Sequence, residues 1–216
     1  FLYGKKNMNK VTVLNNAIEC DKFRFYEEIR NEYRKKLGLE DRFVIGNVGR
    51  FCEQKNQLFL IDIFSECQKK IRNAELVLVG DGPMKSEVES KVNQLGLMDK
   101  VHFLGTRNDV EKVLQALDVF VLPSLFEGLP VIGIEAQASG LPMVVSDTVT
   151  SELNLGNVSF VSLTEKSEIW ADVIARCKIN TERSVAFKKV ANLGYEINNE
   201  AKRLKEYYFR LVNKEY

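Results

Sequence analysis

The sequence lacks what several classes of protein need. His102 is the only histidine, and four scattered cysteines, Cys20, Cys52, Cys67 and Cys177, form no CxxC pair. A zinc site or a disulfide framework needs closely spaced cysteines or histidines, so neither is favoured, and we expect free thiols in a reducing cytoplasm. No G-x-G-x-x-G or G-x-x-x-x-G-K-[ST] sequence is present, which argues against an NAD-dependent dehydrogenase and against a P-loop.

Long apolar runs and an excess of one charge are also missing. No stretch approaches the roughly 20 apolar residues that span a bilayer, and no signal-peptide pattern opens the chain. The net charge of +1 gives no global indication of nucleic acid or of an anionic surface. The 216 residues, 45% of them hydrophobic, are typical of a soluble globular protein. Because the chain opens with FLYGKKNMNK and not with Met, we expect a fragment.

Short β-rich runs alternate with segments of helical period, as expected for an α/β fold with a doubly wound parallel sheet. The predicted strands are 11–14, 43–48, 76–79, 101–104, 119–122, 143–145 and 159–161. The predicted helices are 22–37, 55–71, 84–95, 109–117, 131–139 and 166–177. No linker or repeat divides the chain, so we predict a single domain over 1–216 with a C-terminal helical segment over 183–214.

In such folds ligands bind beyond the carboxyl ends of the strands, and the loop after strand 43–48 carries suitable residues there. In NVGRFCEQKN, Gly49 permits close backbone approach, while Arg50 and Lys55 flank the start of a helix. Helix N-termini favour anions, so these cations could bind a diphosphate. The alternative is a surface loop with solvated charges.

The loops after strands 76–79 and 101–104 are less specific. VGDGPMKSE is interpreted as a structural turn, with Pro83 in the first turn of the next helix. In FLGTRNDVEK, backbone groups near Thr106 and Arg107 could read the edge of a nucleobase, and Asn108 could cap the following helix. We interpret His102 as a packed strand residue and not as a catalytic base.

The loop after strand 119–122 places two glutamates eight positions apart in PSLFEGLPVIGIEAQASG. Glutamate is rarely buried unless it is paired. Glu127 precedes a short apolar helix and Glu135 lies in that helix, with Pro130 suited to its first turn. Both carboxylates facing a cavity would suit a ligand rich in hydroxyls. Alternatively, Glu127 stabilises the helix N-terminus and Glu135 forms a buried ion pair.

Five motifs in order, VLNNAIECDKF, GRFCEQKN, LVLVGDGP, VHFLGTRNDV and the E-x7-E stretch, resemble one family over nearly the whole chain. They are similar to the C-terminal donor-binding domain of retaining GT-B glycosyltransferases of family 4 (glycosyltransferase group 1), especially members that assemble polysaccharides. The resemblance implies a Rossmann-like domain, the C-terminal half of a GT-B fold. Asn16-Ala17 replaces the commoner Asn-Gly, so no role is assigned there.

The resemblance also implies roles for the loop residues. Arg50 and Lys55, beside Gly49, would hold the donor diphosphate, Glu127 would contact sugar hydroxyls, and Glu135 would accept hydrogen bonds from the ribose. Backbone N–H groups would support sugar and phosphate, and Thr106 and Arg107 would border the base. The residues that would supply those N–H groups are Gly128, Leu129, Val131 and Ile132. Pro130 stands where many members have glycine and cannot donate a hydrogen bond.

The implied function is transfer of a hexosyl group, with retention, from a nucleotide-diphosphate sugar, with UDP favoured as the nucleotide, in polysaccharide, capsule or cell-envelope glycan synthesis. Neither a cofactor nor a metal is expected, since the chain contains no D-x-D. The acceptor, a glycan or a lipid-linked glycan, would bind a missing N-terminal domain, so we expect the fragment alone to be inactive. No nucleic-acid partner is expected. We expect a cytoplasmic protein, with the full-length form at the inner face of the membrane as an alternative.

Two rival functions remain open at this stage. One is a GT-B-like nucleotide-sugar epimerase, which would need acid and base groups around the sugar. The other is a non-catalytic nucleotide-sugar-binding module. Tyr207, Tyr208 and Phe209 in the last helix would contact the missing domain or pack on this one.

Overall fold

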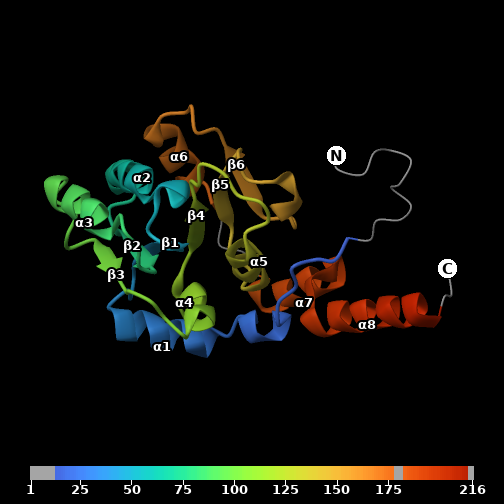
Figure 1. Ribbon diagram of the computed structural model, residues 1–216. Helices are drawn as coiled ribbons and strands as arrows, with labels where there is room; N and C mark the ends of the chain where they lie inside the picture. Colours follow the sequence, from blue (N-terminus) through green and yellow to red (C-terminus); the bar gives the residue numbers. More distant parts are fainter. Residues whose placement is uncertain (1–12, 178–181, 214–216) are drawn as a thin grey trace.

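The computed structural model describes residues 13–177 and 182–213 (Figure 1). Within them, six parallel strands form one sheet in the order β3-β2-β1-β4-β5-β6. This strand order is that of a Rossmann-like doubly wound fold, so the predicted fold class is confirmed. The strands are β1 (Phe43–Val48), β2 (Ala74–Val79), β3 (Val101–Phe103), β4 (Val119–Leu122), β5 (Met143–Ser146) and β6 (Val158–Val161).

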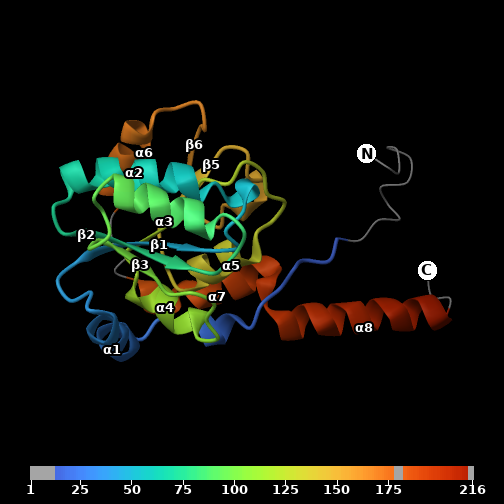
Figure 2. The same cartoon turned by 60° about the vertical axis from the view of Figure 1, so that its left-hand side comes forward.

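Helices cover both faces of the sheet (Figures 1 and 2). One face carries α2 (Gln57–Lys70), α3 (Lys85–Gln94) and α6 (Ser167–Ala175). The other carries α1 (Glu27–Leu37), α4 (Val110–Ala116), α5 (Val131–Ala138) and α7 (Ala186–Val190). Short helical turns occur at η2 (Cys20–Phe23), η3 (Glu53–Lys55), η4 (Ser151–Leu153), η5 (Arg183–Val185) and η6 (Ala191–Tyr195), before α8 (Ile197–Asn213).

Two hydrophobic cores lie on the two faces because successive strand side chains point to opposite sides. Val44 and Val77 belong to the core under α1, α4 and α5, whereas Ile45 and Leu76 belong to the core under α2, α3 and α6. The fully buried Trp170 completes the second core. Strands covered on both faces read as continuous apolar runs, which is why β2 and β4 were predictable.

At the ends of the chain, the structure contradicts one sequence expectation and confirms the other with an interruption. Residues 11 and 12 lie outside the described residues, and Val13 and Leu14 are exposed coil, so 13–14 add no strand to the sheet. The helical segment 183–214 is confirmed over the described 183–213 but is not one helix. Gly194 adopts φ +91 between α7 and α8, a left-handed conformation that interrupts helical geometry.

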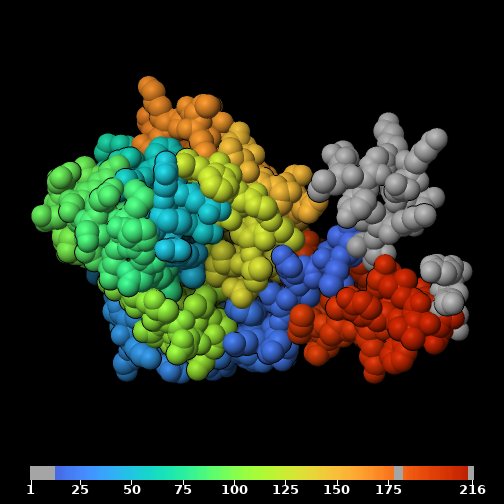
Figure 3. All heavy atoms as spheres, in the orientation of Figure 1, coloured from blue at the N-terminus to red at the C-terminus, as the bar shows by residue number. Residues whose placement is uncertain are grey.

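The helix α8 projects from the rest of the molecule (Figures 2 and 3). Its base is fixed by Glu200, whose carboxylate accepts hydrogen bonds from the backbone of Asn15 (3.3 Å) and from Arg203 (2.9 Å). Tyr208 and Phe209 are 59% and 58% exposed, so ordinary packing on this domain does not describe them. Among the described residues, no helix combines the length and apolarity that crossing a membrane requires.

Candidate functional site

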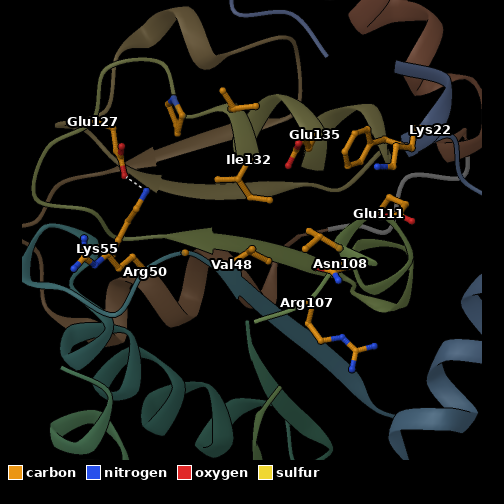
Figure 4. Close-up of a pocket in the computed structure, with 15 residues that line it drawn as sticks. Lys22, Val48, Arg50, Lys55, Arg107, Asn108, Glu111, Glu127, Ile132 and Glu135 are labelled. Carbon is orange, nitrogen blue, oxygen red and sulfur yellow. Dashed lines mark hydrogen bonds and ion pairs between the residues drawn. The ribbon is translucent and has the colours of Figure 1, made fainter. Parts of the chain in front are cut away.

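The sheet order itself locates the site. The loop after β1 leads to α2 on one face, and the loop after the neighbouring β4 leads to α5 on the other face. Ligands in open α/β sheets bind in the crevice at such a switch point. A pocket of about 610 Å³ lies there, and Figure 4 shows its lining side chains. It is lined by Lys22, Phe23, Val48, Gly49, Arg50, Lys55, Arg107, Asn108, Val110, Glu111, Glu127, Pro130, Val131, Ile132 and Glu135.

One end of the pocket contains an ion pair between Lys55 and Glu127 (Figure 4). The Glu127 carboxylate also accepts a hydrogen bond from the Ser124 hydroxyl (3.1 Å) and one from the Gln54 side chain (3.4 Å). Its side chain is 9% exposed, so these partners offset the cost of removing a charge from water. The Glu127 carboxylate is therefore held by one side chain of its own loop and by two side chains of the loop after β1, and not by the N-terminus of α5.

The loop that carries Glu127 is attached to η3 by hydrogen bonds. The Leu125 N–H donates to the Gln54 carbonyl (2.8 Å), and the Gln54 side chain donates to the Phe126 carbonyl (2.9 Å). Asn56 extends the attachment by donating to the Pro123 carbonyl (3.1 Å). These contacts fix the relative position of the loop after β1 and the loop after β4, which carry the two sets of predicted functional residues.

The Arg50 side chain lines the same end of the pocket. It is exposed, and it makes no hydrogen bond or ion pair with any other described residue. Lys55 packs over Gly49, with its Cε 3.4 Å from where a Cβ on that glycine would lie. One cation without a partner and one shared with a carboxylate thus lie beside exposed backbone, an arrangement that suits a diphosphate.

The VGDGP loop has the structural role predicted for it. The Phe51 N–H donates to the Asp81 carbonyl (3.0 Å), and the Met84 N–H donates to the Phe51 carbonyl (3.1 Å). A Cβ on Gly80 would overlap the Gly49 carbonyl, and one on Gly82 would overlap the Phe51 backbone. The two glycines therefore allow this loop to support the loop that carries Arg50.

The other end of the pocket contains the Glu135 carboxylate. Burial raises its pKa, the ammonium of Lys22 lowers it, and the like charge of Glu111 raises it further. Within the described residues the Glu135 carboxylate has no hydrogen-bond or ion-pair partner, so the buried ion pair considered from the sequence is wrong. A half-buried carboxylate that faces a cavity without a partner is available to accept hydrogen bonds from a ligand.

The loop after β3 lines the pocket with Arg107 and Asn108, directly before Val110 and Glu111 of α4. The Arg107 guanidinium donates to both oxygens of Asp109 (2.7 and 2.5 Å), and the Tyr33 hydroxyl donates to the same carboxylate (2.6 Å). Arg107 chiefly lowers the pKa of Asp109 to about 2. Figure 4 shows the Arg107 side chain directed away from the two glutamates. The predicted cap at Asn108 is wrong, because α4 begins at Val110 after Asp109.

Most of the predicted site residues meet in this pocket. Thr106, Gly128 and Leu129 do not line it, whereas the others do: Gly49, Arg50, Lys55, Arg107, Glu127, Val131, Ile132 and Glu135. Lys22 and Glu111 are additional charged lining residues. Lys22 lies in VLNNAIECDKF, the motif given no role because of its Asn-Ala, and Glu111 is an ordinary surface residue by sequence pattern. His102 lies on β3, 2.6 Å from the Glu75 carboxylate, and does not line the pocket.

An open parallel sheet in this order, with its pocket at the switch point, defines a Rossmann-like ligand-binding domain. Residues 29–189 match the family described as glycosyl transferases group 1, and the chain belongs to this family. Its solved structural neighbours are GT-B glycosyltransferases. The recognition of a group 1 glycosyltransferase from the ordered motifs is therefore confirmed, whereas retention and family 4 stay predictions.

Individual relatives are similar over nearly all of this chain. The putative glycosyltransferase EpsF of Bacillus subtilis is 39% identical over 203 residues, 91% of this chain and 53% of that protein. The UDP-Gal:alpha-D-GlcNAc-diphosphoundecaprenol alpha-1,3-galactosyltransferase of Escherichia coli is 31% identical over 217 residues, 94% of this chain and 55% of that protein. The chain thus spans about half the length of the curated relatives it matches.

A solved structure supports the fold in the same way. Anabaena Alr3699/HepE, in complex with UDP and glucose, superposes with a TM-score of 0.78 at 22% identity. The superposition covers 91% of this chain and 56% of that one.

Proposed function

We propose that this chain supplies the donor site of a glycosyltransferase that moves a hexosyl group, with retention, from a nucleotide-diphosphate sugar to an acceptor. The observation that carries the proposal is one pocket with the cations of Arg50 and Lys55 at one end and the partner-free carboxylate of Glu135 at the other. Glu127 lies beside Lys55. Such a pocket offers donors to phosphates and acceptors to hydroxyls.

The charges are suited to the leaving group. As the bond to the anomeric carbon breaks, the sugar gains oxocarbenium character and the diphosphate gains negative charge. Arg50 and Lys55 stabilise that charge more in the transition state than in the ground state, which is the condition for raising the rate. Loss of one such preorganised contact should raise the barrier by about 2–4 kcal/mol. No step in this scheme uses a metal or a cofactor, and the absence of both stays a prediction.

The remaining roles are assigned by position. Glu135 accepts hydrogen bonds from the ribose hydroxyls, and Glu127 from those of the sugar. The backbone N–H groups of Val131 and Ile132 face the sugar and phosphates, and the backbone near Arg107 borders the base. Gly128, Leu129 and Thr106 do not line the pocket, so their roles in donor binding rest on the resemblance alone. The Arg107 side chain is already bonded to Asp109, so its role would be structural.

UDP is the nucleotide we propose. The E. coli relative is named for UDP-Gal, and the Anabaena protein was solved with UDP and glucose. The names EpsF and Vi polysaccharide biosynthesis protein VipC/TviE among the relatives favour a role in polysaccharide synthesis. The acceptor, a glycan or lipid-linked glycan, would be bound outside this chain, in the cytoplasm or at the inner face of the membrane, and the chain alone would not transfer. An epimerase is less well supported, because the only histidine lies outside the pocket.

Calorimetric titration of the 216-residue chain with UDP and GDP tests the donor site. We expect UDP to bind, and Arg50→Ala and Glu135→Gln each to weaken it by about tenfold, the usual scale for one charge-assisted hydrogen bond. Arg72→Ala is the matched control, since Arg72 is an exposed arginine that does not line the pocket. Equal weakening by all three variants, or no binding by the unaltered chain, would contradict the proposal.

Retention is tested separately in the full-length protein. The anomeric configuration of the product, read by NMR, should match that of the UDP-sugar donor. Donor binding without transfer in the full-length protein would favour the non-catalytic module instead.

A further inference from the structure

Three charged side chains from three separate elements meet at the end of the pocket remote from Lys55. Lys22 comes from η2, Glu111 from α4 and Glu135 from α5, and η2 packs against both helices. In the view of Figure 4, Lys22 and Glu111 lie on one side of this end of the pocket, and Glu135 lies toward the other side, on α5. None of the three side chains makes a hydrogen bond or an ion pair with another residue in the described part of the chain. Their arrangement therefore has no evident role in holding the fold together.

The charges of Lys22 and Glu111 both act on Glu135. Burial and the negative charge of Glu111 both favour the protonated form of Glu135, and the positive charge of Lys22 favours the ionised form. Without Lys22, burial and the charge of Glu111 would both raise the pKa of Glu135, and neither would oppose the other. Lys22 is thus the nearby charge that opposes neutralisation of Glu135.

The protonation state matters because the two forms of a carboxyl group bind hydroxyls differently. An ionised carboxylate accepts hydrogen bonds at both oxygens, and charge-assisted bonds of this kind are roughly twice as strong as neutral ones. A neutral carboxylic acid carries an O–H donor on one oxygen and has less capacity left to accept hydrogen bonds. A pair of adjacent ligand hydroxyls is therefore bound best by the ionised form.

We propose that Lys22 is a positioning residue of the donor site, which keeps Glu135 ionised against Glu111 and thereby sets the lower pH limit of nucleotide binding. The proposal rests on the proposed function, in which Glu135 binds the ribose hydroxyls. Lys22 acts through Glu135 and needs no contact with the ligand.

Other charged groups lie near α5 but are not among the charges that shift the pKa of Glu135. The pocket also contains the cations Arg50 and Lys55 at its opposite end and Arg107 in the loop after β3. The charges that shift the pKa of Glu135 are those of Lys22 and Glu111. Charged side chains on the elements packed against α5 that lie outside the pocket are Asp21 on η2 and Lys188 and Lys189 on α7. The response of Glu135 to pH is therefore assigned to Lys22 and Glu111.

The test is calorimetric titration of the chain with UDP between pH 5 and pH 8. For Lys22→Met we expect the loss of affinity on acidification to begin at higher pH, with binding at pH 5.5 about fivefold weaker than that of the unaltered chain, as for one lost charge near a surface. At pH 8 the two should bind almost equally. Lys22→Arg should behave as the unaltered chain, and Lys22→Met combined with Glu111→Gln should regain most of the loss.

Two controls separate this role from a merely structural one. Lys112→Met removes an exposed lysine of α4 that does not line the pocket and should leave the pH profile unchanged. A 2′,3′-dideoxy analogue of UDP lacks the hydroxyls and should bind with the same pH dependence to the unaltered chain and to Lys22→Met.

Opposite results would overturn the inference in recognisable ways. If the profiles of Lys22→Met and the unaltered chain are parallel, or if the dideoxy analogue shows the same difference as UDP, Lys22 does not act through Glu135. If the unaltered chain binds no UDP at any pH, the proposed function itself fails, and the inference fails with it.

Discussion

At the scale of single residues, the two glutamates of the E-x7-E stretch have opposite environments. Glu127 is paired with Lys55 and accepts hydrogen bonds from Ser124 and Gln54, so its orientation is fixed before any ligand arrives. In the part of the chain that the structure describes, the Glu135 carboxylate has no such partner, and burial raises its pKa. The Glu127 carboxylate is thus preorganised. The hydrogen bonding of the Glu135 carboxylate depends on a ligand, and its ionisation depends on nearby charges. The two should respond differently to substitution.

Glu127→Gln should separate sugar recognition from nucleotide recognition. Removing the carboxylate frees the Lys55 ammonium from its ion pair, so UDP should bind as well as before or up to about tenfold more tightly, the scale of one charge-assisted hydrogen bond to a phosphate. Any additional affinity of UDP-glucose over UDP should be lost, because the acceptor for sugar hydroxyls is gone. Calorimetry with both ligands measures the difference.

The control for that experiment is Glu53→Gln, which changes the net charge equally at an exposed position of η3 outside the pocket. It should alter neither affinity. Weaker UDP binding by Glu127→Gln, with the preference for UDP-glucose retained, would show that Glu127 supports the phosphates and not the sugar.

The sequence could predict the position of both glutamates but not their state. Both follow the same strand, so their approach to one ligand site was predictable from the fold rule alone. The ion pair between Lys55 and Glu127 joins residues 72 positions apart, and it depends on the exact packing of two loops. Lys22 was missed for a related reason, since its role follows only from the packing of η2 against α4 and α5.

At the scale of elements, the loops after β1 and β2 behave as one unit. The backbone of Phe51 is bonded on both sides to the loop after β2, and Gly80 adopts φ +130 directly over the Gly49 carbonyl. The loop that carries Arg50 can occupy its position because the neighbouring loop has no side chain at Gly80 or Gly82.

Gly82→Ala should lower both stability and nucleotide binding. The new Cβ would overlap the backbone of Phe51, which cannot move aside as a flexible side chain could. Overpacking of this kind costs about 1–3 kcal/mol, and we expect the free energy of unfolding in urea to fall by that amount. UDP affinity should fall as well, because relief of the overlap displaces Arg50.

Gly96→Ala provides the comparison for Gly82→Ala. Gly96 lies at φ +67 with open space around its Cα, so alanine there incurs only the backbone penalty of about 1 kcal/mol and should leave UDP binding unchanged. If Gly82→Ala has no effect on UDP affinity, the two loops are not coupled as described.

Element positions were predictable where the pattern was local. Continuous apolar runs predicted the six strands within two residues at each end, because strands buried on both faces need apolar side chains throughout. The first predicted strand had a similar local pattern at 11–14, but Val13 and Leu14 have no neighbouring strand to pair with. The interruption at Gly194 was missed because one glycine in a long helical pattern is compatible with either outcome.

At the scale of the whole molecule, Asp118 joins α1, β1 and β4 at the N-terminal ends of the two central strands, on the side of the sheet opposite the pocket. Its carboxylate, 2% exposed, accepts hydrogen bonds from Arg30 and Arg34 of α1 (both 2.5 Å) and from the backbone N–H of Val44 at the start of β1 (2.7 Å). Asp118 itself lies directly before β4. The packing of α1 and α4 against β1 and β4 thus depends on one buried carboxylate.

A second buried group extends this arrangement to the C-terminal part of the chain. The Arg183 guanidinium donates to the carbonyls of Leu117 (3.1 Å), Leu114 (3.3 Å) and Ser139 (3.0 Å), at the C-terminal ends of α4 and α5. Carbonyls at helix ends have no partner within the helix, and a cation there also interacts favourably with the helix dipole. Burial, chiefly, lowers the pKa of Arg183 to about 9.

Asp118→Asn should therefore destabilise the whole domain and not a single loop. Asparagine can still accept the bond from Val44, but it leaves Arg30 and Arg34 largely buried without a countercharge. Breaking a buried ion pair in this way costs about 3–5 kcal/mol, so the urea midpoint should fall with the slope of the transition unchanged. Asp172→Asn makes the same chemical change in the more exposed pair with Lys70 (2.8 Å), between α6 and α2.

The comparison between these two variants decides whether Asp118 has the role assigned to it. A pair as exposed as Lys70 and Asp172 contributes about 0–1 kcal/mol, so Asp172→Asn should barely move the unfolding transition. Because α4 follows the loop at Arg107 that borders the pocket, Asp118→Asn should also weaken UDP binding at low urea, whereas Asp172→Asn should not. Similar small losses of stability in both variants would mean that α1 is held to the sheet by its apolar face, and that the two arginines remain solvated well enough without Asp118.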